Sequence, residues 1–283
     1  MFQIVWKNLP SFTVKHFCSG NTAVAFRCSM PNLVKLTEDS FSELVQSAVS
    51  ALQEGSLIAL PTDTLYGLAA LAQKSEAIHE IYRVKKRNPL KPLAVCVAHV
   101  ADIYHWAKVT VPEKLLLELL PGPVTLVFQR TSILNVDLNP DTDLIGIRIP
   151  DSKFIREISI ACGAPLALTS ANISNQKSPL AVEEFQDIWS NVAVVYDGGI
   201  IGKQINLAAS SSIVQLEQEI DLSRPNKSVT QDSSKITSFE TCVREGSTVV
   251  NLSIEGHYSV LRDGIALENT LSILQKFGLK SLN

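Results

Sequence analysis

Short apolar runs, bordered by glycine, proline or polar residues, recur along most of the chain. Runs of about four to eight residues with such borders are typical of buried β-strands. The sequence therefore predicts strands at residues 56–61, 92–97, 124–129, 145–150, 165–170, 192–199, 247–253 and 258–262.

Apolar residues at helical spacing lie between several of these strands, which predicts helices at residues 38–55, 77–85, 112–120, 182–189 and 268–277. In the first of them, Ser40 followed by Glu43 resembles a capping box, and Gly55 can end the helix in the left-handed conformation. Strands that alternate with helices indicate one α/β domain, and their irregular spacing indicates a mixed sheet.

Two segments depart from this pattern. Residues 1–37 contain no Asp or Glu but four basic residues, which fits either a mitochondrial targeting leader or a disordered tail. Residues 203–245 are rich in Ser, Gln, Asn, Lys and Glu and are too polar to pack as a core, so we predict a disordered insertion. The folded, catalytic domain is expected to span residues 38–283.

Composition narrows the class of protein. The 283 residues carry a net charge of −3 and a sequence pI near 6.0, which argues against binding nucleic acid through overall charge. The five cysteines are far apart, and neither an HExxH nor a P-loop motif is present. We expect a reducing compartment and no metal site built from protein ligands. The longest uncharged stretch, residues 158–176, is interrupted by polar residues and is not expected to span a membrane.

Polar side chains at predicted strand ends are the first candidates for chemistry. Thr62, Asp63 and Thr64 follow one apolar run, and Ser170 and Asn172 end another in the stretch PLALTSANIS. Open α/β sheets bind ligands at strand ends, and small hydroxyls and amides can surround phosphate or ribose oxygens. An ordinary polar turn is the alternative at each position.

A basic run, VKKRNPLKPLAV, adds cations near a strand. Lys85, Lys86, Arg87 and Lys91 stand close together with no acid between them, so a polyanion such as phosphate would relieve their repulsion. A solvated surface is the alternative. A Pro-Gly turn before the strand that carries Thr125 would let a ligand approach the backbone closely.

Taken in order, the motifs PTDTLYGL, KKR with KPLAV, PGPVTLV, GIRIPD, LTSAN, DGG, and GSTVV with LRDG resemble the YrdC family of threonylcarbamoyl-AMP synthases. The resemblance runs from Leu57 to Phe277 and is strongest to the animal YrdC-domain proteins. It implies an open, twisted mixed α/β sheet with flanking helices and a concave basic cavity. At Lys91 and Cys96 this chain differs from microbial relatives, which often have Asn and His there. No separate C-terminal domain of the kind found in some relatives is expected.

The resemblance also implies an activity. A family member uses L-threonine, bicarbonate and ATP, with Mg²⁺ on the ATP phosphates, to form threonylcarbamoyl-AMP and pyrophosphate. The product then serves N6-threonylcarbamoyladenosine modification of tRNA by a KEOPS-like transferase complex or its mitochondrial counterpart. The expected location is cytoplasmic, mitochondrial or both.

Site residues follow by position in the matching motifs. The resemblance assigns the catalytic role to the KxR pair, Lys85 and Arg87. It assigns ATP binding to Arg87, Lys91, Thr125, Ser170, Asn172, Ser178 and Arg262. It assigns threonine binding to Thr64, Arg148 and Ser247. Lys85→Ala and Arg87→Ala are each expected nearly to abolish synthesis. Their melting temperatures should stay almost unchanged, because a cationic cluster adds little to folding.

Two other functions fit parts of the same pattern. A concave basic surface could bind double-stranded RNA or tRNA without catalysis, and steep salt dependence would distinguish that function. A carbamoyl-transfer domain like that of hydrogenase maturation proteins is the other, although the zinc-finger-like and acylphosphatase segments of those proteins are not found in this sequence.

Overall fold

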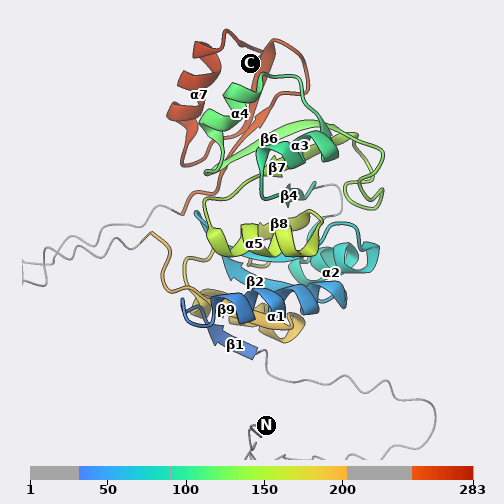
Figure 1. Cartoon of the computed structure of the whole chain (residues 1–283), viewed down its shortest axis with the longest axis vertical. Helices are drawn as coiled ribbons and strands as arrows, with labels where there is room; N and C mark the ends of the chain where they lie inside the picture. The colour runs from blue at the N-terminus through green and yellow to red at the C-terminus, as the bar shows by residue number, and fades with distance from the viewer. Residues whose placement is uncertain (1–31, 89–90, 203–243, 283) are drawn as a thin grey trace, which may run out of the picture.

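The computed structural model describes residues 32–88, 91–202 and 244–282. In this part of the chain the strands form one twelve-stranded sheet in the order β1-β9-β2-β3-β8-β4-β7-β6-β10-β11-β12, with β5 paired to β6 (Figure 1). The strands are β1 (Asn32–Lys35), β2 (Ile58–Pro61), β3 (Tyr66–Leu71), β4 (Ala94–Cys96), β5 (Ala107–Lys108), β6 (Val124–Arg130), β7 (Leu144–Arg148), β8 (Leu166–Ser170), β9 (Val194–Asp197), β10 (Thr248–Asn251), β11 (His257–Arg262) and β12 (Lys280–Ser281).

The sheet is mixed, as the sequence predicts. Strands β2, β3, β8 and β4 pair antiparallel in succession, whereas β4 with β7 and β6 with β10 are parallel. The flanking helices are α1 (Phe41–Gln53), α2 (Ser75–Lys85), α3 (Val100–Trp106), α4 (Glu113–Leu119), α5 (Lys153–Cys162), the 3₁₀ helix η1 (Val182–Asn191) and α7 (Leu267–Lys276). The α/β fold class is confirmed.

Hydrophobic clusters cover both faces of the sheet. Ile58 and Leu60 of β2 belong to the cluster under α1 and α5, whereas Ala59 between them belongs to the larger cluster under the other helices. Because successive strand residues point to opposite faces, the two clusters lie on opposite sides. Figure 1 shows α1 and α5 on the same side of the sheet, and the two helices are in contact with each other.

All of the predicted strands are present, although four others were missed. Strands β1, β5 and β12 are only two to four residues long and give little pattern. Strand β3 is buried at every position, so its sequence shows no alternation of apolar and polar residues. It also begins just after the polar turn at residues 62–64, which the sequence pattern indicates as a candidate site and not as the start of a strand.

The predicted helices are also present, with two corrections. Ser40 does begin α1 and Gly55 follows it with φ 85°, but the Ser40 hydroxyl bonds Thr37 at 2.6 Å instead of capping the helix, so the capping-box prediction is wrong. Residues 182–191 form a 3₁₀ helix instead of an α-helix, interrupted at Phe185, where the ring packs against Tyr66. Helices α3 and α5 were missed.

The boundaries of the predicted segments are partly visible. Strand β1 lies inside the segment expected as a leader and pairs in parallel with β9, so the ordered fold begins by Asn32 and not at residue 38. The rest of that segment, and residues 203–243 of the predicted insertion, lie outside the described residues. In the part of the chain that is described, no helix has the length and apolar character needed to cross a membrane.

Candidate functional site

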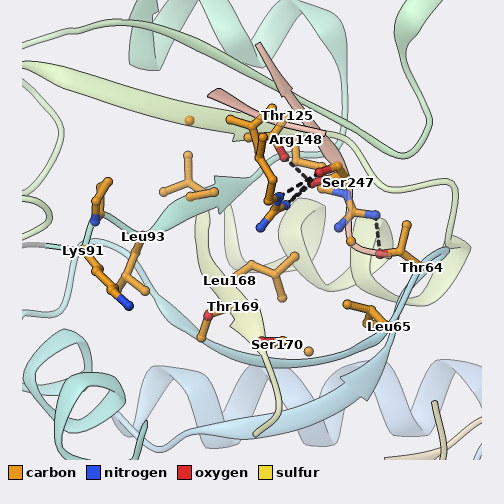
Figure 2. A pocket seen from close by; sticks show the side chains of 18 of the residues that line it. Thr64, Leu65, Lys91, Leu93, Thr125, Arg148, Leu168, Thr169, Ser170 and Ser247 are labelled. Atoms are coloured by element: carbon orange, nitrogen blue, oxygen red, sulfur yellow. Dashed lines mark hydrogen bonds between the residues drawn. The ribbon is translucent and has the colours of Figure 1, made fainter. Parts of the chain in front are cut away.

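A cavity of about 620 Å³ opens where the central strands and their loops meet. Figure 2 shows Thr125, Arg148 and Ser247 gathered on one wall, Thr64 and Leu65 near them, and Lys91 and Leu93 on the opposite side. Nine residues that the sequence predicts for the site line this cavity: Thr64, Arg87, Lys91, Thr125, Arg148, Ser170, Ser178, Ser247 and Arg262.

Strand register explains why distant residues meet on one wall. Thr125 of β6 pairs with Arg148 of β7 on one side and with Val249 of β10 on the other, and Val249 pairs with Arg262 of β11. Directly paired residues in a sheet present their side chains on the same face. The pairing of β10 with β11 shifts immediately after Val249, and such irregularities commonly re-aim side chains next to a functional site.

Ser247 is the centre of a hydrogen-bonded network on that wall. The Arg262 guanidinium donates from Nη2 to the Ser247 carbonyl at 2.8 Å and to its hydroxyl at 3.0 Å, and the hydroxyls of Ser247 and Thr125 lie 2.8 Å apart. Gly264 packs directly behind, since a Cβ at that residue would come 2.4 Å from the Thr248 nitrogen. The network therefore presents two hydroxyls and a guanidinium in a fixed arrangement.

The loop between β2 and β3 holds a second guanidinium group, that of Arg148 on β7, in position. Nη2 of Arg148 forms an ion pair with Asp63 and donates to the Thr64 hydroxyl at 2.9 Å. The Thr62 hydroxyl organises the loop by donating to the Leu65 carbonyl at 2.7 Å. Burial lowers the pKa of Arg148 while the Asp63 carboxylate opposes this, and the buried Arg148 Nε has no hydrogen-bond partner. Asp63 thus fixes the orientation of Arg148.

Every charged side chain among the described residues that line the cavity is a cation. Arg87, Lys91, Arg148 and Arg262 line it, and no acidic side chain is among the described residues that do. Burial lowers the pKa of Arg262, and the positive charges of Arg148 and Arg87 lower it further. Guanidinium groups close enough to disfavour one another's charge would be stabilised by an anion between them.

Arg87 and Lys85 have different positions, contrary to the expectation that both face the ligand. Arg87 lines the cavity, where its guanidinium donates to the carbonyls of Lys91 at 3.1 Å and Pro92 at 2.8 Å. Lys85 is 1% exposed and is not among the lining residues. Lys86 between them ends α2 in the left-handed conformation with φ 47°, which turns the chain and sends the two side chains in different directions.

Lys85 lies behind the cavity wall. Its ammonium donates to the carbonyls of Ser170 and Asn172, the latter at 2.6 Å, and lies 3.4 Å from the Asn172 side-chain oxygen. Asn172 is itself buried, does not line the cavity, and donates from Nδ2 to the Gln176 carbonyl at 2.7 Å. Burial, with a smaller contribution from the charge of Arg87, lowers the pKa of Lys85 to about 7. These two predicted site residues hold the end of β8 in place.

Sequence reasoning also missed parts of the site. Much of the apolar portion of the lining consists of residues in or next to strands that the pattern assigns to an ordinary core, among them Leu93, Val95, Val127, Leu168 and Leu261. Cys96 is buried and does not line the cavity, and burial raises the pKa of its thiol to about 12.

Comparison with known proteins places this cavity in context. The Sua5/YciO/YrdC family model, described as telomere recombination, matches residues 50–226. The chain is 47% identical over 239 residues to the threonylcarbamoyl-AMP synthase of Bos taurus, covering 84% of this chain and 74% of that protein. It is 46% identical over 240 residues to the threonylcarbamoyl-AMP synthase of Homo sapiens, with the same coverage of both chains.

A solved structure shows the same architecture. The Sua5 of P. abyssi, determined in complex with L-threonine, is similar with a TM-score of 0.67 over 89% of this chain and 62% of that chain. The sequence identity is 22%, so the likeness concerns the fold. It confirms the predicted YrdC-like open sheet.

Proposed function

Because the chain belongs to the Sua5/YciO/YrdC family, we propose that it is an L-threonylcarbamoyladenylate synthase, a nucleotidyltransferase that acts in tRNA modification. Its substrates are L-threonine, bicarbonate and ATP, and its products are threonylcarbamoyl-AMP and pyrophosphate. The relatives that carry the synthase name support this activity over an RNA-binding module without catalysis, as does the acidic sequence pI of about 6.0.

The observation that carries the proposal is the convergence of Arg87, Arg148 and Arg262 with the hydroxyls of Thr125 and Ser247 in one cavity. Its volume of about 620 Å³ lies within the range of roughly 300–1,000 Å³ typical of small-molecule sites. Guanidinium groups bind phosphate and carboxylate oxygens through paired hydrogen bonds. The lining therefore suits two anionic reactants bound together.

The chemistry explains why cations are needed. The threonine nitrogen first forms an N–C bond to bicarbonate carbon with loss of water, which gives the carbamate. The carbamate oxygen then attacks the α-phosphorus of ATP, a new P–O bond forms, and the bond to the β-phosphate breaks to release pyrophosphate. Both reactants are anions, so the site must offset their repulsion and align them. We assign ATP phosphates to Arg87 and Arg262, with Lys91, Thr125, Ser170 and Ser178 around the nucleotide. We assign threonine to Thr64, Arg148 and Ser247.

Mg²⁺ is proposed to enter with ATP. The described lining residues offer hydroxyl oxygens but no carboxylates, which fits a metal coordinated mainly by substrate phosphates and water. When bound in this way, Mg²⁺ neutralises part of the phosphate charge. The chain's own residues then position the phosphates from the protein side.

Partners and location extend the same proposal. Threonylcarbamoyl-AMP would be passed to a KEOPS-like threonylcarbamoyl transferase complex or its mitochondrial counterpart. The acid-free residues 1–37, with four basic residues, support delivery of part of the protein to mitochondria alongside a cytoplasmic pool. Fusion of this segment to a fluorescent reporter tests that delivery, and a uniformly cytosolic signal would reject it.

The activity is tested with purified protein, Mg²⁺-ATP, labelled bicarbonate and L-threonine. We expect the label in threonylcarbamoyl-AMP together with an equal amount of pyrophosphate, and neither product when L-threonine is omitted. Tight RNA binding that weakens steeply with salt, without formation of the mixed anhydride, would instead support the binding module.

A further inference from the structure

An ion pair at the edge of the cavity joins parts of the chain that the sheet keeps apart. Arg244 donates from Nη1 and Nη2 to the two carboxylate oxygens of Glu184, each at 2.7 Å. Nη1 also donates to the Ser178 carbonyl at 3.0 Å, and the same carboxylate accepts the Leu180 backbone N–H at 2.8 Å. Hydrogen bonding to Arg244 is the main reason that the pKa of Glu184 is lowered to about 2.

The Glu184 side of the pair belongs to the β3 and β9 end of the sheet. The Pro179 carbonyl accepts the Tyr66 N–H at the start of β3, and the Leu180 carbonyl accepts the Ile201 N–H that follows β9. Ser178, which directly precedes Pro179, lines the cavity. Glu184 itself lies in the first turn of η1, so its carboxylate directly follows a loop that is anchored to two strands.

The Arg244 side belongs to the β10 and β11 end. Arg244 precedes Gly246 and Ser247, both of which line the cavity, and Ser247 is held by Arg262. Four strands, β8, β4, β7 and β6, separate β3 from β10 in the sheet. Gly246 nevertheless lies beside Leu65, since a Cβ on Gly246 would come 3.7 Å from its side chain. Arg244 and Glu184 thus connect the two ends of a curved sheet across the cavity.

We propose that Arg244 and Glu184 form a clasp that positions Ser178 relative to Ser247 and so sets the affinity of the cavity for nucleotide. The proposal rests on the proposed function only for the identity of the nucleotide, ATP. Neither residue lines the cavity, so both act through the residues that they hold. A bidentate Arg–carboxylate pair suits this task because its planar geometry fixes orientation as well as distance.

The chain contains a matched control. Glu80 and Arg83 on α2 form another bidentate pair, with Nε of Arg83 2.7 Å from Glu80 Oε2, and neither residue lines the cavity. The test compares Arg244→Met, Glu184→Gln, the double variant and the control Glu80→Gln. For each protein, the Kd for Mg²⁺-ATP is measured by calorimetry, together with the KM for ATP, kcat and the melting temperature.

We expect Arg244→Met and Glu184→Gln each to weaken ATP binding about tenfold, because small misplacements of binding groups are costly. The double variant should be no weaker than the singles, since the two residues act as one unit. Glu80→Gln should bind ATP as the native protein does. If Arg244→Met is insoluble, Arg244→Lys, which keeps the charge but not the fork geometry, should bind ATP with intermediate affinity.

Two outcomes would overturn the clasp. Native ATP affinity in the Arg244 and Glu184 variants would do so, whether or not their melting temperatures fall. Additive losses in the double variant would show that the residues act separately. If the native protein binds ATP but makes no threonylcarbamoyl-AMP, the proposed function is refuted. The Kd values of the variants for Mg²⁺-ATP would still decide whether the clasp exists.

Discussion

Lys85 is the residue for which the structure changes the expected outcome most. As part of an exposed basic run it would contribute little to stability, but it is 1% exposed and its ammonium holds the carbonyls of Ser170 and Asn172. We therefore predict that Lys85→Met, which keeps the length of the side chain, destabilises the fold. Lys86→Met is the matched control, because Lys86 is the exposed neighbour.

The magnitude follows from the contacts. Each hydrogen bond to a charged group contributes about 1.5–3 kcal/mol, so the loss of two gives about 3–6 kcal/mol. Removing the ammonium also removes the cost of burying it, which offsets part of that loss. A net loss of about 2–4 kcal/mol is expected for Lys85→Met, or a fall of roughly 5–15 °C in melting temperature for a domain of this size. Lys86→Met should stay within about 0.5 kcal/mol of the native protein.

Urea unfolding followed by tryptophan fluorescence measures this difference. At pH 6 the ammonium of Lys85 is protonated, since its pKa is about 7. The decisive quantity is the unfolding midpoint of Lys85→Met compared with that of Lys86→Met. If Lys85→Met unfolds at the same urea concentration as the native protein, the buried position of this side chain is refuted. The sequence-based expectation that Lys85 faces the ligand would then be restored.

Three further predictions follow from the site. Arg87→Ala should lower kcat/KM for ATP about a hundredfold to a thousandfold in steady-state assays because Arg87 lines the cavity, and it should also lower the urea midpoint because its hydrogen bonds to the Lys91 and Pro92 carbonyls are lost; a loss of kcat/KM below tenfold would contradict its role. Gly264→Ala should cost about 1–3 kcal/mol or more, because its Cβ would clash with the backbone of Thr248; unchanged thermal unfolding would contradict this. The ionised Glu184 contributes stability that is present above its ordinary pKa near 4.5 and is lost as pH falls toward 2. The free energy of unfolding should therefore decline more steeply over that range in the native protein than in Glu184→Gln, by at most about 1 kcal/mol, and identical slopes would exclude the pair with Arg244.

The sequence by itself determined the class of fold and most of the residues around the cavity. Buried strands and amphipathic helices differ in their local periodicity, so the α/β alternation can be recognised without any tertiary information. Polar residues such as Thr64, Ser170 and Ser247 interrupt apolar runs near strand ends, and they line the cavity. Because such interruptions are local, they mark the site even in a single sequence.

Only the tertiary structure decided which of these residues meet and which way they point. Thr125, Arg148 and Arg262 share one wall because β7, β6, β10 and β11 pair in a particular register, and pairing between distant segments leaves no trace in local periodicity. Lys85 and Arg87 stand two positions apart in one basic run, yet the left-handed backbone at Lys86 buries the first and places the second in the cavity. The direction of a side chain depends on backbone dihedral angles and on the elements packed around it, which are properties of the folded chain as a whole.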